Sequence, residues 1–258
     1  MEPVSASTNL GLRTNHQLRA RGRRGWTQIL CMFGVLALLG AVVGRTAAAD
    51  AEPSPTDAVG RLIIDDQRLC TAFIVWSDVR QVSDGFGGRS TVYENWLATA
   101  GHCHGGNLVF QHRGQAYPTR VIGFSAGRTN GGFDVMVMSF VTDRRLPTLE
   151  PAFGEYPQVG DPLMLVGYGS RALMMRVGPL LRYDERGHME IRGYASRGNS
   201  GGPVLIPGTR RVVGIGIETT LDKPEGASFI YCILAICAVK PPYTAAHIDR
   251  LKGLANFH

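Results

Sequence analysis

Short apolar runs separated by turn residues fill the chain from Val59 onward. Many of these runs are rich in Val, Ile, Phe and Tyr, which are enriched in β-strands. We expect about a dozen strands, at 61–65, 70–76, 91–98, 107–112, 117–123, 134–140, 162–168, 172–182, 188–193, 203–206, 211–217 and 227–237. The pattern predicts an all-β protein built from barrels or a sandwich.

Two stretches depart from this strand pattern. Residues 79–90 hold three glycines among mostly polar neighbours, which predicts an enlarged surface loop between two strands. Residues 245–254 carry apolar side chains at helical spacing, and Thr244 stands where an N-cap belongs. The sequence therefore predicts one C-terminal helix.

Charge is concentrated at the N-terminus. Six arginines against one glutamate give residues 1–49 a net charge of +5, so only +1 of the total of +6 remains for residues 50–258. A domain that binds nucleic acid usually carries a basic patch on its folded part. The nearly neutral remainder therefore predicts no nucleic-acid partner.

The N-terminal segment has the three parts of an export signal. An arginine cluster at 19–24 precedes an almost uncharged run, 26–44, and Ala47 and Ala49 form a small-residue exit. We expect residues 1–49 to be a signal peptide cleaved after Ala49, which predicts a secreted, extracellular protein. The alternative is a type II anchor in which 26–44 tethers the chain to the membrane. In both cases 50–58 is a leader or linker and 59–258 is the folded domain, outside the cytoplasm.

The stretch Arg197-Gly-Asn-Ser-Gly-Gly-Pro-Val204 places Ser200 on a glycine turn. Glycine allows unusual backbone angles and close backbone contact. Such a turn can expose the serine hydroxyl and direct backbone N–H groups into one concavity, which gives a nucleophile and an oxyanion hole. The alternative is an ordinary turn between two strands.

A candidate base lies at the end of another apolar run. Residues 97–104 read Leu-Ala-Thr-Ala-Gly-His-Cys-His, so His102 follows a small-residue turn. Outside the cytoplasm, Cys103 is expected to form a disulfide with Cys70, which would hold this turn against the adjacent strand. The alternative is two free, buried thiols. A further pair, Cys232 and Cys237, is five positions apart and would point to opposite faces of a regular strand, so its state is left open.

The two motifs Thr99-Ala-Gly-His-Cys103 and Gly198-Asn-Ser-Gly-Gly-Pro203 resemble those of the chymotrypsin/trypsin-like serine proteases, in the same order along the chain. The resemblance covers 59–258. It implies two six-stranded antiparallel β-barrels with a C-terminal helix and a boundary near 145–158. It also implies an acid before an apolar strand, which Asp134 matches. Asp143 is the alternative acid, although it follows that strand.

By this resemblance His102 is the base, Asp134 its orienting acid and Ser200 the nucleophile, with the backbone N–H groups of Gly198 and Ser200 as oxyanion hole. No metal or other cofactor is expected, and His104 is interpreted as a loop residue. Where digestive members carry Asp, this chain has Asn199, which resembles the glutamyl-endopeptidase-like and high-temperature-requirement branches. The opening Ala58-Val-Gly-Arg-Leu62 resembles the former more closely. Since Asn cannot form an ion pair with a new N-terminus, activation through that ion pair is not expected.

Counting from the motifs predicts a primary substrate pocket with one wall on each side. Its lining residues are expected to be Tyr194, Ala195, Ser196, Arg197, Gly216, Ile217, Glu218 and Thr219. No acid stands at the predicted base, so a small or apolar substrate residue is favoured. The sequence thus predicts a secreted serine endopeptidase acting on proteins or peptides. The alternative is a catalytically silent homologue that acts as a binding protein.

Overall fold

The computed structural model describes residues 52–255 except 84, 86, 126–132, 194, 220–228, 234–235 and 241. Within that range, the side chains of residue 170, residues 218–219 and the strands between 229 and 240 are not described. The chain divides into two units, Met1–Glu52 and Pro53–His258, and every described element lies in the second. The expected signal or anchor lies outside the described residues. No helix in the described part of the chain is long and apolar enough to cross a bilayer.

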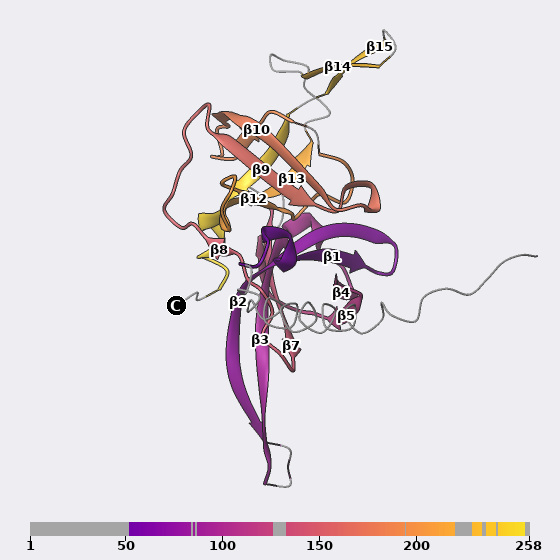
Figure 1. Cartoon of the computed structure of the whole chain (residues 1–258), viewed down its shortest axis with the longest axis vertical. Helices are drawn as coiled ribbons and strands as arrows, with labels where there is room; N and C mark the ends of the chain where they lie inside the picture. The colour runs from indigo at the N-terminus through magenta and orange to yellow at the C-terminus, as the bar shows by residue number, and fades with distance from the viewer. Residues whose placement is uncertain are drawn as a thin grey trace, which may run out of the picture. The chain divides into compact units, whose positions relative to one another are not determined.

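The first half of the folded unit is one seven-stranded sheet, coloured indigo to magenta in Figure 1. A 3₁₀ turn, η1 (Pro55–Ala58), leads into it. Its strands are β1 (Val59–Ile64), β2 (Arg68–Ser83), β3 (Arg89–Ala100), β4 (Leu108–His112), β5 (Gln115–Pro118), β6 (Arg120–Ser125) and β7 (Val135–Thr142). They are ordered β5-β4-β1-β2-β3-β7-β6, with antiparallel pairs throughout. The short turn η2 (Gly101–Cys103) follows β3.

The second half is a closed barrel, coloured orange to yellow in Figure 1. Its elements are β8 (Glu150–Pro151), β9 (Pro162–Gly167), η4 (Gly169–Arg171), β10 (Met174–Tyr183), β11 (Met189–Ile191), β12 (Pro203–Leu205), β13 (Arg211–Thr219), β16 (Tyr243–His247) and η5 (Ile248–Leu251). Six strands follow one another as β12-β9-β10-β11-β16-β13, and β12 pairs again with β13 to close the ring. The two-residue strand β8 joins β13 in parallel.

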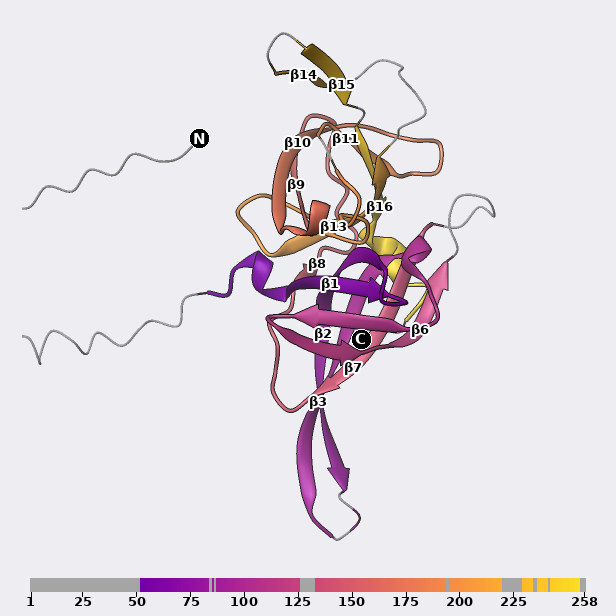
Figure 2. The same ribbon diagram turned by 90° about the vertical axis from the view of Figure 1, so that its right-hand side faces the viewer.

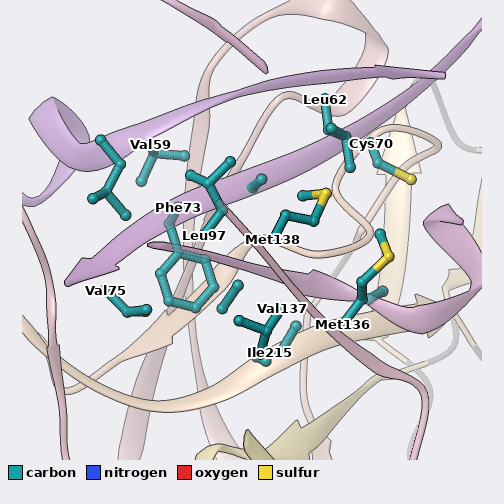
Figure 3. Packing of buried hydrophobic residues seen from close by; sticks show 14 of the residues in the cluster. Val59, Leu62, Cys70, Phe73, Val75, Leu97, Met136, Val137, Met138 and Ile215 are labelled. Atoms are coloured by element: carbon teal, nitrogen blue, oxygen red, sulfur yellow. The ribbon is translucent and has the colours of Figure 1, made fainter. Parts of the chain in front are cut away.

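A continuous apolar core joins the two halves. Phe73, Leu97 and Val137 from the first sheet are fully buried, and Ile215 of β13 belongs to the same cluster (Figure 3). A second cluster fills the barrel itself, with Leu165 among its members. Burying a side chain of this size stabilises the fold by roughly 1.5–3 kcal/mol. The shared core therefore fixes the elements that carry the candidate site to one another.

The all-β prediction is confirmed, and most expected strands coincide with observed ones within a few residues. The two expected β-structures are present, but the first is a seven-stranded sheet and the second is a closed six-stranded barrel. Among the described strands only those of the second half close into a ring, because β5 and β6, the two edge strands of the first sheet, do not pair with each other. The expected boundary, 145–158, falls between β7 and β9 and contains the short strand β8.

The prediction of a loop at 79–90 is wrong for most of this segment. β2 and β3 continue through it as a two-stranded ribbon that extends beyond the rest of the sheet (Figures 1 and 2), with Gln81 paired to Thr91. Only residues 84–88 connect the strands. The ribbon has polar residues on both faces, so its sequence lacks the apolar alternation that marks a half-buried strand.

The C-terminal helix is also a wrong prediction. Thr244 lies inside β16, whose five residues are all buried and pair with both β11 and β13. Only the single 3₁₀ turn η5 follows. The segment forms a strand despite its helical spacing, because closing the barrel buries both of its faces. The region expected as one strand at 227–237 forms a separate hairpin of β14 (Phe229–Ile233) and β15 (Ile236–Lys240).

Candidate active site

His102 is presented by the turn η2 at the end of β3. The strand enters the turn through fully buried Ala98 and Ala100. A side chain at Gly101 would lie 2.4 Å from the carbonyl oxygen of Ser125, so only glycine fits there without a shift of the backbone. The imidazole of His102 is 42% exposed and can therefore meet a substrate.

Asp134 lies directly before β7 and is paired with His102. Its Oδ2 is 2.8 Å from His102 Nδ1, and its Oδ1 accepts the backbone N–H of His102 at 2.6 Å. The residue is 4% exposed and has a φ of 55°, a left-handed conformation that Asp tolerates better than most residues. Since a carboxylate only accepts hydrogen bonds, Nδ1 carries the proton and the Nε2 of a neutral His102 is free to act as a base. Asp143 is exposed beyond the opposite end of β7.

Ser200 lies on a tight turn between β11 and β12, which we call the nucleophile turn (residues 196–202). Gly198 and Gly201 have φ angles of 100° and 86°. A Cβ at Gly198 would lie 2.4 Å from the carbonyl oxygen of Tyr168. Glycine is thus required at these positions by both conformation and space.

Four N–H groups of the nucleophile turn have no acceptor among the described residues, and those of Gly198 and Ser200 are two of them. The N–H groups of Asn199, Gly201 and Gly202 bond to backbone oxygens at 2.7–3.0 Å. Two open N–H groups beside a serine hydroxyl are what an oxyanion hole needs.

The His102 turn and the nucleophile turn meet at a disulfide. Cys70 and Cys103 are bonded, with their Cα atoms 6.2 Å apart, and Cys103 Sγ lies 3.9 Å from the carbonyl oxygen of Ser200. By loop entropy, a bridge across 33 residues stabilises the fold by about 4 kcal/mol. Among the described residues no hydrogen bond joins Ser200 to His102. Such bonds often form only when substrate is present.

The Cys70–Cys103 disulfide also determines whether a nearby group of potential ligands can bind a metal ion. Ligand atoms of Cys70, His102 and Cys103 lie within 4.8 Å of one another. Both sulfurs are used in the S–S bond, and a thiolate is the form of cysteine that binds a metal, so this group is not a metal site. His104 is stacked on Phe124, with ring centroids 4.6 Å apart.

A pocket of about 210 Å³ opens beside Ser200. It is lined by Leu165, Ala195, Ser196, Arg197, Asn199, Ser200, Gly216, Ile217, Tyr243 and Thr244. Five of the eight predicted lining residues are among these: Ala195, Ser196, Arg197, Gly216 and Ile217. Tyr194 lies outside the described residues, as do the side chains of Glu218 and Thr219. None of the ten described lining residues is acidic.

Tyr243 is a pocket residue that the sequence did not reveal. It is 1% exposed at the start of β16, and its hydroxyl has no partner among the described residues. Burial raises the pKa of the phenol above its ordinary value, so the group stays neutral. Tyr243 was overlooked because the helix expected from Thr244 onward placed no barrel strand there.

An oriented histidine and a serine on a glycine turn, carried by a seven-stranded sheet and a closed barrel, are the arrangement expected of a serine hydrolase related to the double-barrel fold. The sequence comparison agrees, because residues 65–215 match the trypsin-like peptidase domain. The chain belongs to this family and is classed by it as a serine protease.

Solved structures share the fold. The crystal structure of the serine endoprotease from Yersinia pestis superposes with a TM-score of 0.55 at 13% identity, over 79% of this chain and 66% of that one. At this identity the likeness establishes a common fold. None of the curated proteins matches the sequence significantly.

Proposed function

We propose that this chain is a secreted serine endopeptidase that cleaves peptide bonds through an acyl-enzyme, with His102, Asp134 and Ser200 as its triad. The observation that carries the proposal is the buried Asp134 carboxylate, which bonds both the ring and the backbone of His102. The open N–H groups of Gly198 and Ser200 supply the second half of the machinery.

The reaction follows from these groups. Ser200 Oγ attacks the carbonyl carbon while its proton passes to His102 Nε2, and the N–H groups of Gly198 and Ser200 hold the oxyanion that forms. His102 then returns the proton to the leaving amine as the C–N bond breaks, which leaves an ester on Ser200. Water attacks that ester in the same way and restores the serine. Asp134 keeps the ring in the required tautomer and stabilises the imidazolium.

The pocket supports a preference for a small or apolar residue before the scissile bond. Its described walls include Leu165, Ala195 and Ile217, and the phenol of Tyr243 is neutral. A cationic substrate residue would lose its hydration without meeting an acid among the described lining residues, which is costly.

We also propose that the active site forms without an N-terminal ion pair. Asn199 is 2% exposed, and its side-chain oxygen packs against the backbone at Gly167 and Gly169. Because this amide is uncharged, it cannot form the ion pair that a buried aspartate would form with a cationic N-terminus; among the described residues its Oδ1 accepts no hydrogen bond. The assignment to the glutamyl-endopeptidase-like branch stays a prediction that rests on Asn199 and on the opening 58–62.

The disulfide supports the localisation part of the proposal. A disulfide such as Cys70–Cys103 is typical of proteins in an oxidising compartment. We propose that the protein is secreted, with a type II membrane anchor as the alternative. N-terminal sequencing of the exported protein separates the two: a start after Ala49 supports secretion, and an intact apolar run supports the anchor.

The rival function is a silent homologue that binds proteins without cleaving them. A fluorophosphonate probe, which reacts with an activated serine, tests this directly on the full chain. We expect the wild-type protein to be labelled and Ser200→Ala to be unlabelled. An unlabelled, folded wild-type protein would favour the silent homologue.

A further inference from the structure

A threonine of the first sheet bonds directly to the nucleophile turn. Thr71 follows Cys70 in β2 and is fully buried. Its backbone N–H donates to the carbonyl oxygen of Ser200 at 2.8 Å. Its hydroxyl donates to the carbonyl oxygen of Gly198 at 2.7 Å. One residue therefore holds the carbonyl groups of both Gly198 and Ser200, the two residues proposed to form the oxyanion hole.

The direction of the Thr71 hydroxyl is fixed from the other side. Its oxygen accepts the backbone N–H of Tyr168 at 2.8 Å, so the single hydroxyl proton is left to point at Gly198. The Thr71 carbonyl in turn accepts the hydroxyl of Thr99 at 2.7 Å. Every polar group of this buried residue is thus satisfied by the elements around the active site.

One of the two residues held in this way, Gly198, has more conformational freedom than a residue with a side chain. Gly198 has a left-handed φ and no side chain, so several backbone conformations are open to it. An oxyanion hole is effective because its donors are already oriented before the charge develops. The bond to the Gly198 carbonyl restricts the conformation of this residue and can thereby keep its N–H oriented before the charge develops.

We propose that Thr71 is a positioning residue for the oxyanion hole, and that its hydroxyl keeps the N–H of Gly198 directed at the developing charge. This inference rests on the function proposed above. A purely structural role of Thr71 would give a different experimental result. A buried hydroxyl that only satisfies its neighbours would, when removed, lower stability and leave kcat unchanged.

The test compares Thr71→Val, Thr71→Ser and Thr142→Val in the full chain. Val keeps the shape of Thr without the hydroxyl, and Ser keeps the hydroxyl. Thr142 of β7 is the matched control, a buried threonine whose hydroxyl bonds Asn95 and the carbonyl oxygen of Arg144. Loss of a whole oxyanion donor costs about 10²–10³ in kcat, and a misdirected donor costs part of that. We expect T71V to lower kcat and the fluorophosphonate labelling rate by roughly 10–10²-fold with KM nearly unchanged.

T71S should stay close to the wild-type kcat, and T142V should lose stability without losing kcat. If T71V does not fold, Thr71→Ala against T71S gives the same comparison, because the two differ only in the hydroxyl. A T71V or T71A protein with wild-type kcat, or a T71S protein as impaired as T71V, would overturn the role of Thr71. An unlabelled wild-type protein would instead overturn the proposed function.

Discussion

At the scale of single residues, Asp134 combines an uncommon backbone conformation with two hydrogen bonds to His102. Its φ of 55° turns the carboxylate back over the His102 turn just before β7 begins. Asn is the only other residue with similar tolerance of this conformation and a similar shape. An Asp134→Asn substitution can therefore remove the charge while keeping the fold.

We expect Asp134→Asn to lower kcat by about 10⁴-fold, because an amide can hold His102 in the wrong tautomer. Asp143→Asn is the matched control, since Asp143 is exposed beyond the far end of the same strand. Its kcat should stay within about twofold, as expected for a surface change. Fluorophosphonate labelling rates at neutral pH measure the reactivity of Ser200 in both variants. If D143N lost its labelling and D134N kept the wild-type rate, the orienting acid would be Asp143 and not Asp134.

His102 and Ser200 of the candidate site were predictable from the sequence because both lie in short, unusual motifs. His102 and Ser200 stand among glycines and small residues whose spacing carries information about turns. Thr71 could not be identified in this way, because a threonine in a strand is unremarkable. Its partner Gly198 lies 127 positions away, and only the folded chain brings the two together.

At the scale of elements, the junction of β16 and η5 depends on a neutral histidine. His247 is 2% exposed; its Nε2 donates to the carbonyl oxygen of Glu155 at 2.7 Å, and its Nδ1 accepts the N–H of Asp249. The ring also stacks on Tyr156 at 4.0 Å. Burial lowers the pKa of His247 despite the opposing charge of Asp249.

This pKa shift has a defined sign. The unfolded chain takes up the proton at the ordinary pKa of about 6.5, before the folded chain does, so stability falls as pH drops below that value. We expect His247→Asn, which keeps a capping acceptor for Asp249, to lose less stability than the wild type between pH 7.5 and pH 5. Urea unfolding at both pH values measures this. Equal losses in the two proteins would contradict the role of His247.

The strands were predictable where one face is buried and the other is not. Two elements were not, and for opposite reasons. The β2–β3 ribbon is exposed on both faces, so only long-range pairing reveals it. β16 is buried along its whole length, and its apolar residues also fit a helical period. In both cases the structure is decided by contacts that local periodicity does not contain.

At the scale of the whole molecule, the candidate site depends on both halves of the fold. His102 and Asp134 come from the first sheet, whereas Ser200 lies on a turn that leads into the barrel. The shared apolar core and the bonds of Thr71 hold these parts in register. The sequence predicted two β-structures, and it could not predict that only the second closes, since closure rests on the β12–β13 pairing.

The central claim is that Ser200 performs peptide-bond hydrolysis with His102 and Asp134. The most direct measurement is a peptide-library cleavage profile of the full chain, read by mass spectrometry beside Ser200→Ala. We expect cleavage after small or apolar residues by the wild-type protein and none by S200A. Peptides that stay intact with folded wild-type protein, or the same cleavages with S200A, would contradict it.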